Sequence, residues 1–173
     1  MEPKIYTLQE AENASKEYFC GDELAARVWS TKYALKDSFG NLFELTPDDM
    51  HHRLASEIAR IEEKYPNPMS EAELFELMRD FKYIVPQGSP MTGIGNHFQV
   101  SSLSNCFVIG QDGSNDSYGA IIQLDEEQVQ LMKRRGGVGH DLSTIRPNGS
   151  PVKNSALTST GLVPFMERYS NST

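Results

Sequence analysis

Two cysteines carry the most distinctive chemistry in this sequence. Cys106 ends the run Ser-Leu-Ser-Asn-Cys and opens the short apolar segment CFVIG, which we expect to form a buried strand. A thiol at a strand end, beside hydroxyl and amide side chains, can act as a redox group or a nucleophile. A lone cysteine is more often a small buried hydrophobe, and the residues alone favour that interpretation for Cys106 and for Cys20. The two are far apart in sequence and do not form a metal or disulfide framework.

A group of glycines follows a predicted long helix in the run RRGGVG. Gly136 and Gly137 would let backbone N–H groups approach a bound nucleotide or sugar closely. The alternative is a helix C-cap, in which Lys133, Arg134 and Arg135 complement the helix dipole and Gly136 takes the left-handed conformation. The spacing matches neither a Walker loop nor the dinucleotide fingerprint, so those two nucleotide-binding folds are disfavoured.

Other polar residues could contact a ligand or a metal. Asp116 and Ser117 open the long helix, so Asp116 is either an N-cap or an acceptor for a ligand hydroxyl beside a helix end that favours phosphate. Arg146, held extended by the proline that follows it, could bind phosphate or face the solvent. His51 and His52 point in different directions on a helix, which makes a poor metal site, and we assign both to the solvent.

The composition is that of a globular protein. The 173 residues are 38% apolar and 23% charged, which is enough for a real core. The formal net charge of −8 argues against a general nucleic-acid binder. No window approaches the roughly 20 apolar residues that span a bilayer, and the first residues lack the apolar core of a signal peptide. We therefore expect a cytoplasmic protein that binds neither nucleic acid nor membrane.

Helices dominate the elements that must position these residues. Thr46 before Pro47 is an N-cap signal, and Ser70 with Glu73 has the capping-box arrangement. After Pro86 the chain becomes glycine-rich, and we divide it into a helical region, 1–85, and a second region, 86–173. The predicted helices cover residues 7–19, 21–35, 47–65, 71–83, 118–134 and a last stretch from about residue 161.

The order of these motifs resembles the catalytic large chain of ribonucleotide reductases. The succession is Ser89-Pro90, SLSNCFVI, Asp116-Ser117, a helix ending in RRGGVG, IRPNGSP and TSTGLVPFMERY. It is most similar to bacterial forms related to the adenosylcobalamin-dependent group, and it runs from about residue 84 onward. The segment ELTPDDMHHRLASEIARIE also resembles the family's N-terminal helical region. The implied fold class is an α+β, mostly helical chain: the N-terminal helical region and the first part of a ten-stranded α/β barrel.

The resemblance implies a role in catalysis for the thiol. In the family, a thiyl radical removes the ribose 3′ hydrogen, and a pair of cysteines then supplies the reducing equivalents for loss of the 2′ hydroxyl. Cys106 matches the first cysteine of that pair, which replaces the buried-hydrophobe interpretation. The positions that match the substrate-binding residues of the family are Ser89, Ser104, Asn105, Gly136 and Gly137.

The resemblance also implies a regulatory site. Asp116, Ser117 and Arg146 match the region that binds a deoxynucleoside triphosphate as specificity effector, near the family's dimer-forming helices. The segment at 147–156 would report the identity of the effector to the active site. No basic glycine-containing motif precedes the first helix, so we do not expect overall regulation by ATP and dATP from this part.

The same resemblance defines what this chain would lack. The radical-bearing cysteine, its neighbouring Asn and Glu, and the second cysteine of the reducing pair belong beyond Thr173. We therefore expect an N-terminal fragment or a split gene product without turnover by itself.

The implied partners are a ribonucleotide substrate, the effector, a thioredoxin-like reductant and a second copy in a homodimer. Adenosylcobalamin is expected for the full enzyme, with a radical from a metal-containing small subunit as the alternative, and no cofactor or metal is expected on this part. The rival functions are a non-catalytic nucleotide-binding regulatory module and a structural helical interaction protein.

Overall fold

The computed structural model describes residues 4–110 and 116–172, which belong to two compact units, Met1–Leu103 and Ser104–Thr173. The described elements are mostly helices, with one parallel sheet of two strands, which confirms the expected fold class. Residues 86–103 cluster with the first unit, and the division into family regions at residue 85 stays a prediction. Within the described ranges, no helix combines the length and the apolar character needed to cross a bilayer.

Capping residues begin the helices of the first unit. The Ser70 hydroxyl accepts a hydrogen bond from the Glu73 N–H, and the Glu73 carboxylate accepts one from the Ser70 N–H at 2.8 Å. Thr46 forms the equivalent arrangement with Asp49, so the helix starts predicted at both threonine and serine are confirmed. The helices of this unit are α1 (Leu8–Tyr18), α2 (Glu23–Lys32), α3 (Pro47–Glu62), α4 (Glu71–Met78) and α5 (Gly88–Gly93).

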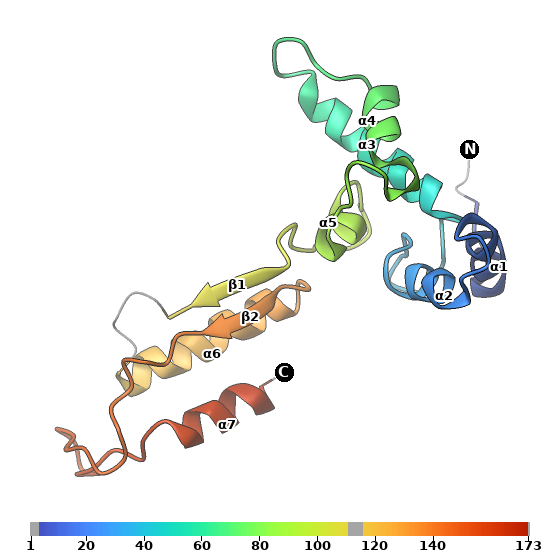
Figure 1. Ribbon diagram of the computed structural model, residues 1–173. Helices are drawn as coiled ribbons and strands as arrows, with labels where there is room; N and C mark the ends of the chain where they lie inside the picture. Colours follow the sequence, from blue (N-terminus) through green and yellow to red (C-terminus); the bar gives the residue numbers. More distant parts are fainter. Residues whose placement is uncertain (1–3, 111–115, 173) are drawn as a thin grey trace. The chain divides into compact units, whose positions relative to one another are not determined.

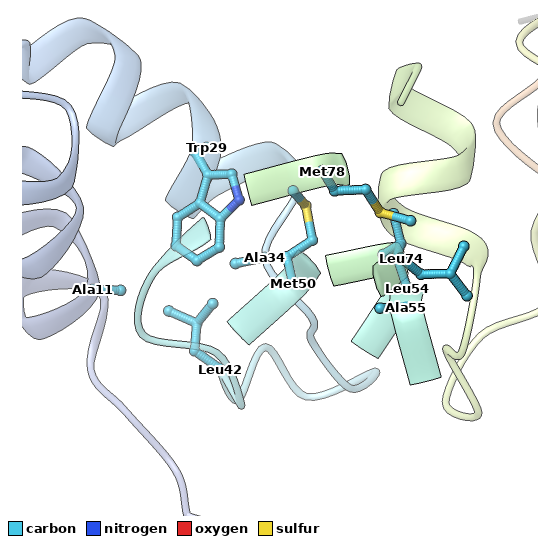
Figure 2. Packing of buried hydrophobic residues seen from close by; sticks show 9 residues of the cluster. All are labelled: Ala11, Trp29, Ala34, Leu42, Met50, Leu54, Ala55, Leu74 and Met78. Atoms are coloured by element: carbon cyan, nitrogen blue, oxygen red, sulfur yellow. The ribbon is translucent and has the colours of Figure 1, made fainter. Parts of the chain in front are cut away.

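The core of the first unit lies where α2, α3 and α4 bring their apolar side chains together. Figure 2 shows the Trp29 indole beside Met50, and Leu54, Leu74 and Met78 grouped where α3 meets α4. Trp29, Met50, Leu54 and Met78 are each at most 2% exposed. Burial of this kind stabilises by about 1.5–3 kcal/mol for each large side chain.

The end of α4 corrects two expectations. The helix stops at Met78, earlier than predicted, because Asp80 and Phe81 adopt positive φ angles of 57° and 54°. This turn places the Phe81 ring 4.6 Å from the ring of His51. His51 is fully buried and not solvent-facing, whereas His52 stays at the surface. The packing of Phe81 against buried rings therefore outweighs the local preference to continue the helix.

The second unit places a two-stranded parallel sheet beside a helix. Strands β1 (Cys106–Ile109) and β2 (Gly137–His140) pair in register, and both contact α6 (Tyr118–Met132). Figure 1 shows α6 running alongside the two strands. The strand β2 was not predicted, because its sequence, GVGH, has two glycines and gives no apolar alternation. The last helix, α7 (Val163–Asn171), begins near the predicted residue 161, and it packs on α6.

The small core of this unit lies between α6, α7 and the sheet. It is formed by Ile121, Leu124, Ile145 and Tyr169. The expectation of a buried strand at CFVIG is wrong, because Cys106 and Val108 are exposed in β1 and Phe107 and Ile109 are only half-buried. One face of the sheet is thus open in this chain.

Candidate functional site

The Cys106 thiol lies on the exposed face of the sheet, directly opposite a glycine. Its Cα is the register partner of the Cα of Gly137, and a β-carbon added to Gly137 would stand 3.8 Å from the Cys106 sulfur. The absence of a side chain there leaves the space beside the thiol open. Cys106 and Cys20 are both exposed free thiols, so the interpretation as buried hydrophobes is wrong for both.

The glycine pair is required by close approach and not by backbone angle. A β-carbon on Gly136 would lie 2.8 Å from the Phe107 ring and 3.2 Å from the Leu131 carbonyl oxygen. On Gly137 it would lie 3.2 Å from the Asn105 carbonyl oxygen, which accepts the Gly137 N–H at 2.6 Å. Both glycines therefore let β1 and the end of α6 meet without a side chain between them.

The basic residues before the glycines end the helix, as the C-cap alternative proposed. The Arg134 guanidinium donates to the Gln130 carbonyl at 2.6 Å. The left-handed position belongs to Arg135, with a φ of 68°, and not to Gly136 as expected. The Gly136 N–H bonds the Leu131 carbonyl at 3.1 Å, which completes a Schellman motif with Arg135 at its C′ position. A Schellman motif usually has its glycine at C′, whereas here the glycine, Gly136, is at C″. The Phe107 ring and the Leu131 carbonyl leave no room for a β-carbon at that position.

The remaining substrate candidates divide between the units. Asn105 and Ser104 directly precede the thiol, and Asn105 is tied to Gly137 through its carbonyl. Ser89 lies in the first unit on α5 and is 5% exposed. The structure thus brings Asn105, Gly136 and Gly137 together around Cys106, and it places Ser89 in a separate, tightly packed segment.

A second candidate site is a cavity of about 380 Å³ beside the first turn of α6. Asp116 and Arg146 form part of its wall. Arg146 Nη2 donates to the Asp116 carbonyl at 3.4 Å, and two bonds reach the carboxylate: the Arg146 N–H to Oδ1 at 3.0 Å and Nε to Oδ2 at 2.7 Å. These bonds, the backbone N–H first, hold the pKa of Asp116 below its ordinary value. Ligand cavities in proteins commonly have about this volume.

The three predicted effector residues meet in this wall, with one change of role. Ser117 is the N-cap of α6, since its hydroxyl accepts from the Ala120 N–H at 3.1 Å. Asp116 precedes the cap and is not the N-cap. The predicted reporting segment also reaches the cavity through Lys153 and Asn154.

A polar cluster on α6 and α7 was missed by the sequence analysis. Arg168 Nε donates to Asp125 Oδ2 at 2.8 Å, and the Gln128 amide donates to the Tyr169 carbonyl at 2.7 Å. The His140 ring stacks on the Tyr169 ring at 4.4 Å, which ties β2 to α7. The residues that pair within this cluster are more than 25 residues apart in sequence, so no local sequence pattern predicts it. Among the residues that the structure describes, no group of three or more His, Cys, Asp or Glu side chains could hold a metal ion.

Two domain families match this chain. Residues 21–92 match the all-alpha domain of ribonucleotide reductase, and residues 104–173 match the barrel domain of ribonucleotide reductase. The boundary between the two matches falls near the boundary between the compact units.

Three similar proteins are named as chains of ribonucleoside-diphosphate reductases. The ribonucleoside-diphosphate reductase subunit alpha of Helicobacter pylori is 28% identical over 144 residues, 83% of this chain and 17% of the relative. The ribonucleoside-diphosphate reductase large chain 2 of Saccharomyces cerevisiae is 33% identical over 69 residues, 40% of this chain and 8% of the relative. The subunit alpha of Buchnera aphidicola is 27% identical over 109 residues, 61% of this chain and 14% of the relative. The chain thus spans less than a fifth of the length of these relatives.

Proposed function

We propose that the chain belongs to the ribonucleotide reductase large-chain family, whose all-alpha and barrel domains match residues 21–92 and 104–173, and that in the whole protein it supplies part of the site that reduces ribonucleotides to deoxyribonucleotides. One observation supports this most directly: the exposed Cys106 thiol faces open space beside Gly137. A sugar could lie against the main chain there, within reach of the sulfur. The names of the relatives favour a ribonucleoside diphosphate as the substrate.

In this proposal Cys106 is a reductant. It and a second cysteine outside these residues give up two electrons and two protons as they form a disulfide. The ribose 2′ hydroxyl leaves as water, and a hydrogen takes its place on the carbon. A thioredoxin-like protein then reduces the disulfide, which requires an exposed sulfur, and Cys106 is exposed.

The radical that starts the reaction comes from a part outside the described residues. The side chains that directly precede Cys106, those of Ser104 and Asn105, are a hydroxyl and an amide, which suit a ribonucleotide better than a metal ion. We therefore assign no residue of this chain to adenosylcobalamin, the cofactor that the resemblance favours, or to a metal-containing small subunit, the alternative. The acidic composition and the free thiols favour the cytoplasm as the location.

Replacing the thiol tests the proposal. In the whole reductase, Cys106→Ser should lower the rate of deoxynucleotide formation with the protein reductant at least a thousandfold, because serine cannot form the disulfide. Cys20→Ser is the matched control, since Cys20 is also an exposed thiol, and it should keep the wild-type rate. Equal rates in the wild type and the Cys106 variant would disprove the assignment.

The cavity beside Asp116 and Arg146 favours a second candidate, a regulatory module that binds a deoxynucleoside triphosphate. Two of the five guanidinium N–H groups of Arg146 lie outside its bonds to Asp116 and Pro151, and they suit a phosphate. Asp116 could accept a ribose hydroxyl. In the whole enzyme this cavity would serve as the effector site beside a dimer interface.

A thermal shift measurement tests the cavity with this chain alone. A deoxynucleoside triphosphate at 100 times its dissociation constant should add about 2.7 kcal/mol of apparent stability. Asp116→Asn should remove the shift, and Glu126→Gln, which changes an exposed carboxylate within α6, should retain it. A shift that survives in the Asp116 variant would place the binding elsewhere. Binding by a protein that fails to reduce ribonucleotides would favour the regulatory module.

A further inference from the structure

A buried arginine of the first unit reaches from α3 into the segment that carries Ser89. Arg53 Nη2 donates to the Met91 carbonyl at 2.8 Å, and Nη1 donates to the Ile94 carbonyl. The Arg53 side chain is only 10% exposed. A buried guanidinium with two carbonyl partners is a strong, directional anchor, because its planar fork fixes the angles of the bonds as well as their lengths.

The segment around α5 depends on this anchor. All of its other carbonyls from 88 to 93 are bonded from within the segment: Gly88 and Ser89 by the Thr92 hydroxyl, Pro90 by the Ile94 N–H, and Thr92 and Gly93 by Asn96. Arg53 on α3 bonds the Met91 carbonyl, and the Ile94 carbonyl directly after the helix, across 38 and 41 residues of sequence. Arg53 therefore ties α5 to α3, in addition to the packing of Met91 and Ile94 against the core.

The intrinsic stability of α5 is too low to replace that anchor. The helix has six residues, including two glycines and a proline. Helices this short are unstable by themselves, and each glycine costs about 0.5–1 kcal/mol relative to alanine. Gly95, with a φ of 69°, also fits the arginine, because a β-carbon there would lie 2.8 Å from Arg53 Cγ.

Glu44 holds the arginine in place. Its Oε1 accepts from Arg53 Nε at 2.6 Å, and its Oε2 accepts from the Leu35 N–H at 2.7 Å. Glu44 is 3% exposed. Burial raises the pKa of Glu44, and the bonds from Arg53 oppose that rise. Contacts thus run from the Leu35 N–H through the Glu44 carboxylate to the Arg53 guanidinium on α3, and from there to α5.

We propose that Arg53, held by Glu44, is a positioning residue for substrate binding, because it fixes the segment from which Ser89 contacts the substrate. The inference rests on the proposed function and on the substrate role that the resemblance to ribonucleotide reductases implies for Ser89. Arg53 itself touches no substrate. Its contribution is geometric, and a displacement of about 1 Å at a binding group can cost up to a hundredfold in rate.

Steady-state kinetics of the whole reductase with a ribonucleoside diphosphate tests the role. Arg53→Met should lower kcat/KM roughly ten- to hundredfold, mostly through a higher KM, because ground-state and transition-state binding are lost together. Arg53→Lys keeps the charge beside Glu44 but loses the planar fork, so its KM should fall between wild type and Arg53→Met. Arg60→Met is the matched control, because Arg60 pairs with Glu57 at the exposed surface of the same helix, and its KM should not change.

Ser89→Ala separates failure of this inference from failure of the proposed function. If Ser89→Ala raises KM while both Arg53 variants keep the wild-type KM, the positioning role is wrong and the substrate site stands. If Ser89→Ala also leaves KM unchanged, the substrate role of Ser89 is wrong, and with it the basis of this inference. Where Arg53→Met does not fold, the lysine variant decides: a wild-type KM in a folded Arg53→Lys enzyme overturns the proposal.

Discussion

The two units of this chain are stabilised in different ways. The first unit buries nine apolar residues in one cluster, whereas the second buries four. In the second unit, polar contacts supply much of the order: Arg168 with Asp125, Gln128 with the Tyr169 carbonyl, and Arg146 with Asp116. Burial therefore contributes more to the helical unit, which also holds the buried Arg53–Glu44 pair, and directional bonds contribute more to the unit with the thiol.

This difference follows from what each unit presents. A binding surface needs exposed main chain and small residues, and the open sheet face of the second unit carries Cys106, Gly137 and Gly139. Such positions bury little apolar area, and a sheet of two strands is marginally stable. The close contact between β1 and the end of α6 at Gly136 and Gly137 compensates in part for the small apolar core of this unit.

The largest expected effect compares the two cores. Leu54→Ala should destabilise the first unit by about 3–5 kcal/mol, because Leu54 is 1% exposed within the larger cluster. Leu124→Ala, at 4% exposure in the smaller cluster, should cost about 2–3 kcal/mol in the second unit. The fluorescence of the single tryptophan, Trp29, reports urea unfolding of the first unit, and amide exchange along α6 reports the second. Equal costs would remove the distinction between the two cores.

The second prediction concerns the glycines of the sheet. Gly136→Ala should cost about 1–3 kcal/mol, because the new methyl group would press into the Phe107 ring at 2.8 Å. Gly139→Ala is the control, since its β-carbon would meet only the Phe107 carbonyl oxygen at 3.9 Å. Amide exchange of β1 measures both. Similar exchange rates in the two variants would show that close packing at Gly136 does not hold the strands.

Local signals explain which elements could be predicted from the sequence. The starts of α3 and α4 follow from Thr46 and Ser70, whose capping partners lie three residues away. The strand β2 and the helix α5 escaped prediction because distant partners stabilise them: β1 for the strand and Arg53 for the helix. Sequence periodicity does not contain such long-range contacts.

The candidate site shows the same division. The order of motifs identified Cys106, Gly136 and Gly137 as neighbours, and the structure places them together. The burial of His51 and the left-handed φ of Arg135 could not be predicted, because each depends on a ring packed from another element: Phe81 in one case and Phe107 in the other.

The third prediction uses pH to test the buried histidine of the first unit. Burial lowers the pKa of His51, and Asp48, 3.8 Å from Nδ1, and Asp80 oppose the shift, while His52 adds to it. Neither ring nitrogen has a hydrogen-bond partner among the described residues.

The unfolded chain therefore takes up a proton near pH 6.5 that the folded unit resists. The contribution of neutral His51 to the free energy of unfolding is fully present above that pH. Below it this contribution falls, by up to about 1.4 kcal/mol for each pH unit, until the lowered pKa of the folded state is reached. His51→Leu should flatten the dependence of the urea midpoint on pH between 7 and 5, and His52→Gln should leave it unchanged. An unaltered slope in His51→Leu would assign the acid sensitivity to other groups.

The smallest effect tests a feature that the two units share. Helices α1 and α6 both end in a Schellman motif whose left-handed C′ residue is not glycine: Cys20 with a φ of 53° and Arg135 with a φ of 68°. The left-handed conformation costs a non-glycine residue about 1–2 kcal/mol, and a glycine avoids this cost. Glycine loses more backbone entropy on folding, however, which offsets about 0.5–1 kcal/mol of the gain. Cys20→Gly should therefore stabilise the first unit by about 0.5–1 kcal/mol, seen as a higher urea midpoint in Trp29 fluorescence.

Arg135→Gly applies the same change to the second unit, where the outcome depends on how that unit is organised. The backbone gain is the same, but the flexible glycine would precede Gly136 and Gly137 and so loosen the approach of α6 to β1. We expect a smaller gain than for Cys20→Gly, measured as slower amide exchange at the end of α6. A gain equal to that of Cys20→Gly would mean that the sheet does not depend on a stiff helix end, and the directional bonds around Asp116 and Asp125 would then carry the order of this unit.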